Sequence, residues 1–344
     1  MPRIAARGDS ESLPADRGIR SHDYLPVSRE TKVGVVLTTE AILRELEPTA
    51  EALLERHLAS SKEWFPHEFV PYSRGRDHVP GETWSADDAD LDGHQIDDAV
   101  RSALLVNLLT EDNLPYYFRS VERMFGRDGA WGTWVRRWTA EEGRHAMAIY
   151  GYLMTTRAID PIELERGRMA QVSGGITPDP DNTHEGFAYL ALQELATRIS
   201  HRSTGKHLDP VGFELMKRVA ADENLHQLFY RDLAEAAIQA DPSGMMIAIE
   251  KQVANFSMPG VGIPNFAEHA GRIARAGIYD LAVHHDQILV PVVIRQWDVE
   301  HLEGLDAEAE QARERLMKRL AKSERVAKRM TDRRQTADAT LVDA

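Results

Sequence analysis

The chain has 344 residues, of which 41 are basic and 55 acidic, so its formal net charge is −14. Apolar residues make up 42% and charged residues 28%, and there is no cysteine. This composition excludes disulfides, cysteine-held zinc or iron–sulfur clusters and a thiol nucleophile. No run approaches the roughly 18 apolar residues of a membrane span, and the acidic balance argues against nucleic acid as a partner.

The first 35 residues are rich in Arg, Ser, Asp and Pro and have no apolar periodicity. Such a segment cannot bury enough apolar surface to fold, and it lacks the apolar core of a secretory signal. We therefore predict a disordered extension at 1–35, one folded domain at 36–335 and a disordered tail at 336–344. The expected location is cytoplasmic.

Helical periodicity follows this extension. Thr39 is the expected N-cap of a first helix whose apolar stripe includes Ile42, Leu46 and Leu53. An irregular stretch at about 60–95 is rich in Pro, Gly and Asp. Further helical patterns occupy 96–125, 130–157, 184–205, 209–239, 242–254, 265–277, 279–296 and 306–334. Alternating β patterns are nearly absent, so the predicted fold class is all-α, with helices long enough for a bundle.

Two of these helices contain the pattern Glu-x-x-His. Glu142 and His145 stand in TAEEGRH, and Glu223 and His226 stand in AADENLH. Residues three apart lie on one face of a helix, so each pair can direct both side chains at one point. A single match is a weak signal, because a chain this rich in Glu and His contains about one by chance.

The two matches have the same context. Glu111 precedes the first pair by 31 residues and Glu194 precedes the second by 29, which corresponds to one helix, a turn and one helix back. One Glu from each of two helices and Glu-x-x-His from each of two others is the ligand set of ferritin-like di-iron carboxylate proteins. Four carboxylates also balance two divalent cations, and carboxylate with imidazole suits iron or manganese.

The alternative is a bundle whose Glu and His side chains face water. Glu111 and Glu194 stand among Leu, Val, Ala and Tyr, where an unpaired acid needs a reason. The doubled pattern therefore favours the metal site. Glu141 and Asp222, which precede the two pairs, are candidates to accept hydrogen bonds from metal-bound imidazoles.

Several longer motifs resemble one family. From about Leu43 to Leu305 the chain resembles the soluble acyl-[acyl-carrier-protein] desaturases, and its versions of the motifs resemble the actinobacterial branch. The motifs are TWVRRWTAEEGRH, LLTEDNLPYYF, LQELATRISHRSTGK and AADENLHQLFYRDL. Gly143 departs from the Asn that is usual in this family.

The resemblance implies a ferritin-like four-helix di-iron bundle core with additional helices and two iron ions per subunit. In the implied arrangement Glu142 and Glu223 bridge the irons, Glu111 and His145 complete one, and Glu194 and His226 complete the other. It also implies roles for three other residues. Thr197 would lie beside the oxygen-binding side, and Asp222 and Trp64 would relay electrons through His145. The alternatives are a Thr that bonds its own helix backbone and a Trp that only packs.

The implied activity is the O₂-dependent introduction of a cis double bond into an acyl chain on acyl carrier protein, with electrons from ferredoxin. The resemblance also implies that the enzyme is a homodimer. A narrow apolar channel should lie beside the metals. Its possible lining residues, for which core packing is the alternative, are Leu114, Tyr117, Met147 and Leu190. Two other interpretations stay open. One is a di-iron oxidase or hydroxylase of another tethered acyl or polyketide chain, and the other is an inactive metal-binding relative, including a storage bundle.

Docking to acidic partners requires a local basic patch, because the chain is itself acidic. One candidate is the Arg- and Lys-rich run at 313–334. The other is the group Arg119, Arg123, Arg136 and Arg137. A solvated helix face is the alternative interpretation of the run.

Overall fold

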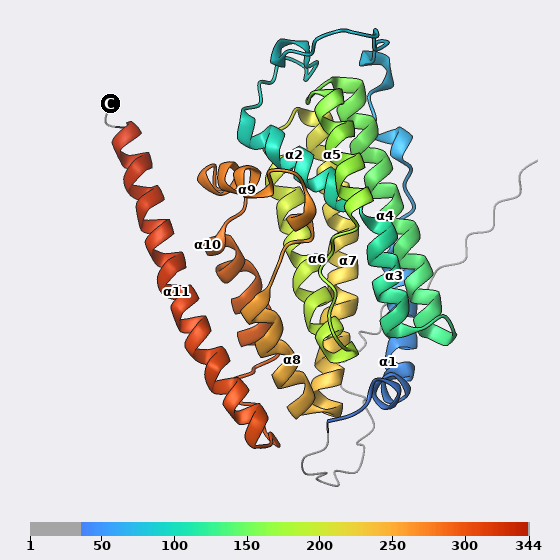
Figure 1. The fold of residues 1–344 in the computed structure, drawn as a ribbon, viewed down its shortest axis with the longest axis vertical. Coiled ribbons are helices and arrows are strands. Elements are labelled where there is room, and N and C mark those ends of the chain that lie inside the picture. Colours follow the sequence, from blue (N-terminus) through green and yellow to red (C-terminus); the bar gives the residue numbers. More distant parts are fainter. Residues whose placement is uncertain (1–35, 343–344) are drawn as a thin grey trace, which may run out of the picture. The chain divides into compact units, whose positions relative to one another are not determined.

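Helices make up nearly all the regular structure in the computed structural model, which describes residues 36–342 and the side chains as far as residue 332 (Figure 1). These residues contain no strand, so the all-α prediction is confirmed. The predicted extension at 1–35 lies outside the described residues. The α-helices are α1 (Thr39–Ser60), α2 (Asp98–Glu111), α3 (Leu114–Phe125), α4 (Gly129–Thr156), α5 (Pro161–Gly174), α6 (Thr183–Gly205), α7 (Pro210–Ala240), α8 (Pro242–Asn255), α9 (Phe266–Arg275), α10 (Leu281–His284) and α11 (Ala307–Val342).

Four helices form the centre of the bundle. Helix α2 packs against α4 and α6, and α7 packs against the same two helices, so the four close into a ring. Helix α1 covers α4 and α7 from outside, and α8 packs against α6 and α7. Figure 1 shows α11 running along the outside of the bundle, beside α8 and α10. No helix in the described part of the chain is both long and apolar enough to cross a membrane.

The apolar core divides into two clusters along these helices. In α4 the first cluster includes Trp134 and Trp138, and the second includes Ile149 and Leu153. Helix α7 also contributes to both, on either side of a short polar section at 222–227. A band of buried charged side chains therefore separates two ordinary hydrophobic cores, and hydrophobic burial on both sides can offset the cost of that band.

The expected helix at 96–125 is two helices. Helix α2 ends at Glu111, and α3 begins at Leu114 with Pro115 in its first turn. A continuous helix would place the proline ring against the carbonyl of Glu111, four residues earlier, and proline has no N–H to donate. The break therefore leaves Glu111 at the very end of its helix.

Other boundaries also differ from the prediction. The N-cap of α1 is Thr38, whose hydroxyl accepts from the backbone N–H of Ala41, and not Thr39. Helix α5 was not predicted, although Asp160 followed by proline is a typical helix start. The region 279–296 divides into α10 and a π-helix at His285–Gln296. Helix α11 continues to Val342, beyond the helical pattern expected at 306–334, because no Gly or Pro ends it.

Candidate metal centre

The structure brings the six predicted residues together inside the ring of helices. Glu111 comes from α2, Glu194 from α6, and the two Glu-x-x-His pairs come from α4 and α7. They form two groups, each with its potential ligand atoms within 4.8 Å of one another, and all members are buried. The first group is Glu111, Glu142, His145 and Glu223, and the second is Glu142, Glu194, Glu223 and His226.

The nitrogen that each histidine turns toward the carboxylates is Nδ1. That of His145 lies 3.3 Å from Glu142 Oε2 and 3.2 Å from Glu223 Oε1. That of His226 lies 2.8 Å from Glu142 Oε1 and 3.8 Å from Glu194 Oε2. Both histidines therefore present the same ring atom to the same small volume.

Several polar atoms here are buried without a hydrogen bond of acceptable geometry to any described residue. They are Glu142 Oε1, His145 Nδ1, Glu194 Oε2, Glu223 Oε1 and His226 Nδ1. A buried polar atom without a partner costs about 1–3 kcal/mol, and more where the group is charged. Five such atoms converging on one volume fit the donor set of a bound metal pair.

The electrostatics of the carboxylates also require positive charge. Burial raises the pKa of Glu194 well above its usual value, and the neighbouring Glu223 and Glu142 raise it further. Burial opposes ionisation of Glu111 too, but the imidazoles of His145 and His201 hold its pKa below the usual range. The cluster can be fully ionised only when cations compensate it.

Outside the cluster, Nε2 of His145 faces Asp222 at 3.5 Å. Asp222 accepts from the indole N–H of Trp64 at 2.7 Å. The guanidinium groups of Arg144 and Arg218 both pair with Asp222 and lie over the Trp64 ring, 4.9 and 5.8 Å from its centre. Burial opposes ionisation of Asp222, but His145, Trp64 and Arg218 lower its pKa to about 2.

Outside His226 the corresponding acceptor is Glu141. Its Oε2 lies 3.0 Å from Nε2 of His226 and 2.9 Å from Nε2 of His57, and its Oε1 pairs with Arg137. Both Glu141 and Asp222 therefore lie where the sequence placed acceptors for the histidines. His57 was not predicted, since nothing in α1 itself distinguishes it from a core histidine.

Two further contacts were also missed. Nε2 of His201 lies 2.8 Å from Glu111 Oε1, and the indole N–H of Trp138 donates to Glu194 Oε1 at 3.2 Å. The only available signal was helical spacing, because His201 falls seven residues, or two turns, after Glu194.

Comparison with known proteins agrees with this centre. The family model described as fatty acid desaturase matches residues 38–343. The chain is 42% identical over 291 residues to a Mycobacterium tuberculosis protein named as the acyl-[acyl-carrier-protein] desaturase DesA1, which covers 81% of this chain and 84% of that protein. The chain belongs to the fatty acid desaturase family.

More distant matches agree with this. A chloroplastic stearoyl-[acyl-carrier-protein] 9-desaturase of Solanum commersonii is 31% identical to this desaturase over 64% of the chain and 60% of the plant protein. The X-ray structure of DesA2 from M. tuberculosis H37Rv superposes with a TM-score of 0.62 at 24% identity, covering 79% of this chain and 99% of the other. The latter match shows that the fold is the same.

In the desaturase Thr197 lies beside the cluster. Its hydroxyl is 2.9 Å from Glu223 Oε2 and also within hydrogen-bond distance of the carbonyls of Gln193 and Glu194. Both interpretations of this residue therefore have a counterpart in the structure, since the side chain contacts its own helix and a cluster carboxylate. One hydroxyl proton can serve only one of these acceptors at a time.

Two cavities flank the cluster. An inner cavity, narrow and with a volume of only about 30 Å³, is lined by Glu111, Glu142, Glu194 and apolar side chains, which include Leu114, Tyr117, Met124, Tyr189 and Leu190. A second cavity between α2 and α9 has Thr110, Glu111 and Thr197 in common with the first, and extends to Phe266 and Tyr279. Leu114, Tyr117 and Leu190 therefore line a cavity beside the cluster, as the channel interpretation expects.

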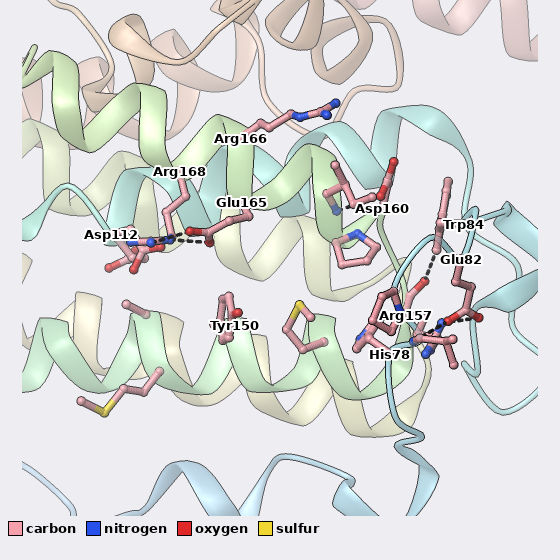
Figure 2. Close-up of a pocket in the computed structure, with 18 of the residues that line it drawn as sticks. His78, Glu82, Trp84, Asp112, Tyr150, Arg157, Asp160, Glu165, Arg166 and Arg168 are labelled. Atoms are coloured by element: carbon pink, nitrogen blue, oxygen red, sulfur yellow. Dashed lines mark hydrogen bonds and ion pairs between the residues drawn. The ribbon is translucent and has the colours of Figure 1, made fainter.

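Met147 does not line these cavities. Its side chain is 67% exposed and lies in a groove between α4 and α5, whose lining includes Glu111 and Leu114 of the inner cavity. Figure 2 shows Tyr150 on one wall of this groove and Glu165 and Arg168 on the other. Met147 is two residues after His145, which on an α-helix is the opposite face, so it lies outside the inner cavity. Its exposure also excludes the core-packing alternative.

Proposed function

We propose that this desaturase uses a pair of iron ions and O₂ to introduce a cis double bond into an acyl chain carried on acyl carrier protein. The observation that carries the proposal is a buried cluster of four carboxylates and two imidazoles that opens directly onto a narrow apolar cavity. The names of relatives in M. tuberculosis and S. commersonii, both acyl-[acyl-carrier-protein] desaturases, support the substrate class.

The proposed ligands follow from membership of the two groups. Glu142 and Glu223 belong to both, so we assign them to bridge the two ions. Glu111 and His145 would complete one coordination sphere, and Glu194 and His226 would complete the other. Bound there, the iron pair would supply the reduction of O₂ that makes hydrogen removal from an unactivated methylene feasible.

The protein would position the alkyl chain beside the cluster and keep water out of the site. Apolar walls formed by Leu114, Tyr117 and Leu190 would hold an alkyl chain against the cluster and exclude water. Thr197 contacts Glu223 on the wall that both cavities have in common, so a chain that runs through both would pass beside its hydroxyl. We assign Thr197 to the oxygen-binding side on that basis.

Electrons would enter through Trp64. The hydrogen-bonded series Trp64, Asp222 and His145 links the outer face of the bundle to one proposed ligand, with separations of 2.7 and 3.5 Å. The flanking guanidinium groups give this entry point a local positive charge. That charge suits an acidic electron donor such as ferredoxin.

Carrier docking is assigned to α11. Lys322, Arg325 and Lys328 are exposed there and have no ion pair with any described residue. In the alternative group Arg123 pairs with Asp179 and Arg137 pairs with the buried Glu141, which leaves Arg119 and Arg136 without an ion pair to any described residue. Helix α11 offers more cations that hold no anion, so we favour it for attracting an acidic carrier.

A homodimer would use the α4–α5 face. Met147, Ile162 and Met169 are exposed on it to 67%, 49% and 53%, so three large apolar side chains are available there for a second copy to cover. Helix α5 carries two Glu and two Arg, so a second copy can approach without the repulsion expected between chains of net charge −14. Sedimentation of the wild type and of a Met147→Glu, Ile162→Glu double variant tests this. We expect the wild type to sediment as two copies and the variant as one.

A cytoplasmic location is also part of the proposal.

Product analysis tests the function. Iron-loaded enzyme, reduced ferredoxin, O₂ and a saturated acyl carrier thioester should give a chain two hydrogens lighter with one cis double bond, located by mass spectrometry. A hydroxylated chain would replace the desaturase assignment with the hydroxylase interpretation. No product, from protein that binds two irons and accepts electrons, would indicate an inactive relative.

A further inference from the structure

A second hydrogen-bonded series leads outward from His226, as the one through Asp222 leads outward from His145. Its members are His226, Glu141 and His57, joined by contacts of 3.0 and 2.9 Å to one carboxylate oxygen. The three residues are exposed by 0%, 3% and 3%. Helix α1 and the segment after it thus provide the outer member of both series, His57 for one and Trp64 for the other.

The shared oxygen fixes the protons of both rings. An ionised carboxylate oxygen can only accept, so Nε2 of His57 and Nε2 of His226 must both donate to it. With its proton held on Nε2, His226 has Nδ1 free to bind a metal, and that atom is the one that faces Glu142 at 2.8 Å. Glu141 therefore determines which nitrogen of His226 faces the cluster.

Glu141 in turn needs a rigid support. Its other oxygen pairs with Arg137 and, at 3.9 Å, with Arg144, whose side chains are 38% and 22% exposed and therefore compete with water. His57 is fully enclosed, with its ring edge-on to Trp134 at 5.0 Å and stacked on His226 at 5.7 Å. Of these three supports, the imidazole is the one that packing holds in a single orientation.

The chemistry of His57 itself points to a role beyond packing. Its Nδ1 is buried with no hydrogen-bond partner among the described residues. A buried polar atom left this way destabilises the fold, and an apolar ring would avoid that cost. What an apolar ring cannot do is donate to Glu141.

We propose that His57 is a positioning residue for the half of the metal site that contains Glu194 and His226. It holds Glu141, and Glu141 holds the ring of His226 with Nδ1 toward the cluster. The inference rests on the proposed function, because it assumes that His226 binds iron. It also makes the two irons inequivalent, since one histidine is supported through an indole between two guanidinium groups and the other through an enclosed imidazole.

The same three residues could instead be a separate metal site, because their ligand atoms lie within 4.8 Å of one another. That arrangement would require Nε2 of His226 to bind a metal while Nδ1 binds another, and so to lose both ring protons. The hydrogen-bond lengths of 2.9 and 3.0 Å are those of donors with an acceptor. The positioning role therefore agrees better with the geometry.

The test compares His57→Phe, which keeps a ring and removes the donor, with His57→Gln, whose amide nitrogen reaches about as far as Nε2. The matched control is His184→Phe, because His184 is also buried and bonded to a carboxylate, Asp241, at 3.0 Å. It lies ten residues before Glu194 on α6, about 15 Å along the helix. Iron release from the reduced full-length holoenzyme to a chelator is followed, together with Mössbauer spectra of ⁵⁷Fe-loaded protein.

In His57→Phe one of the two irons should leave about 10- to 100-fold faster, and one of the two quadrupole doublets should change. The other iron should behave as in the wild type. His57→Gln should restore both values to within a few-fold, and His184→Phe should change neither. Should His57→Phe fail to fold, His57→Asn replaces it, because Asn has the amide of the Gln variant on a side chain one methylene shorter. One iron should then leave faster from His57→Asn but not from His57→Gln.

Three results would overturn the proposal: wild-type release rates in His57→Phe, equal acceleration of both irons, or a Gln variant no better than Phe or Asn. A third iron in the wild type that disappears in the variants would replace it with a separate metal site. Failure of the proposed function can be distinguished from failure of the His57 proposal. A wild-type protein that holds two irons but does not desaturate would overturn the function, and the iron-release experiment would still decide the role of His57.

Discussion

Glu142 on α4 and Glu223 on α7 each belong to both four-residue groups, and their carboxylate oxygens lie within 4.8 Å of one another. No other residue in the two groups has this double membership. The pair therefore sits between the two half-sites, whereas Glu111 and Glu194 each serve one. Removing a shared residue should have a different effect from removing an unshared one.

Iron content per chain should show this difference. Glu142→Ala and Glu223→Ala should each lose both irons, because each removes a ligand from both coordination spheres. Glu111→Ala should retain up to one iron per chain, since only one sphere loses a ligand. Iron analysis after anaerobic loading measures this, and Glu185→Ala, another buried Glu on α6, serves as the control. Equal loss in Glu111→Ala and Glu142→Ala would contradict the bridging assignment.

Trp64→Phe should slow reduction of the centre and leave its iron content unchanged. The substitution keeps an aromatic ring between Arg144 and Arg218 but removes the N–H that donates to Asp222. We expect a fall of about tenfold or more in the rate of reduction by ferredoxin, measured by stopped-flow absorbance. Trp84→Phe is the control, because it also removes an indole N–H. That N–H donates to the backbone carbonyl of Arg157 and not to a residue of the cluster or to Asp222. Wild-type rates in Trp64→Phe would make the packing interpretation correct.

Leu190→Trp should shorten the acyl chains that the enzyme accepts. Leu190 lines the inner cavity, so a larger side chain would occupy space that the alkyl chain needs. Activity on the longest accepted chain should fall about 10- to 200-fold relative to one shorter by a methylene or two. Leu192→Trp on the same helix overpacks the core without lining the cavity, and should reduce stability by about 1–3 kcal/mol without changing chain preference. A parallel loss for all chain lengths would argue against this cavity as the acyl site.

Charge reversal on α11 should weaken carrier binding. The triple change Lys322→Glu, Arg325→Glu and Lys328→Glu removes three exposed cations that have no ion pair with described residues. KM for the acyl carrier substrate should rise about tenfold at low ionic strength with little change in kcat, and the effect should shrink as salt screens it. Lys217→Glu on α7 provides a control at an exposed cation elsewhere. An unchanged KM would remove α11 from consideration.

Asp241→Asn should lower stability in a pH-dependent way. Asp241 accepts from the backbone N–H of Leu37 and Gly244 and from His184. Burial opposes its ionisation, but His184 and these N–H groups lower its pKa below the ordinary 3.8. Its stabilising effect is therefore complete above about pH 4 and is lost as the pH falls through the lowered value.

We expect Asp241→Asn to cost about 1–3 kcal/mol of unfolding free energy at pH 7. The difference from the wild type should diminish progressively below pH 4. Urea unfolding at pH 7 and at pH 3 measures both values on metal-free protein, which keeps iron release out of the comparison. A difference that stays constant across this range would show that the charge of Asp241 contributes nothing.

The proposed ligands could be predicted because each lies on a face that helical periodicity defines. Glu-x-x-His fixes two residues on one face, and the spacing of about 30 residues from Glu111 and Glu194 corresponds to adjacent antiparallel helices. His57 could not be predicted in this way. Its partner Glu141 is 84 residues away, and periodicity says nothing about which residue of a neighbouring helix it will meet.

Boundaries were less predictable than faces. The break between α2 and α3 depends on a clash between Pro115 and the carbonyl of Glu111, which a periodic apolar pattern conceals. The π-helix at His285–Gln296 has Pro291 inside it, and a pattern read at 3.6 residues per turn cannot distinguish it from an α-helix. Met147 lies on the face of α4 opposite His145, which its two-residue offset already indicated.

With the proposed iron pair bound among them, the carboxylates that divide the apolar core would also connect this protein to the supply of iron. Without a cation those carboxylates repel one another at the centre of the bundle, and ions bound only by the folded chain stabilise it by mass action. Where iron is scarce, the bundle should open more often and expose α4 and α7 to proteolysis. The amount of enzyme in a cell would then follow the amount of available iron, without any change in its gene's expression.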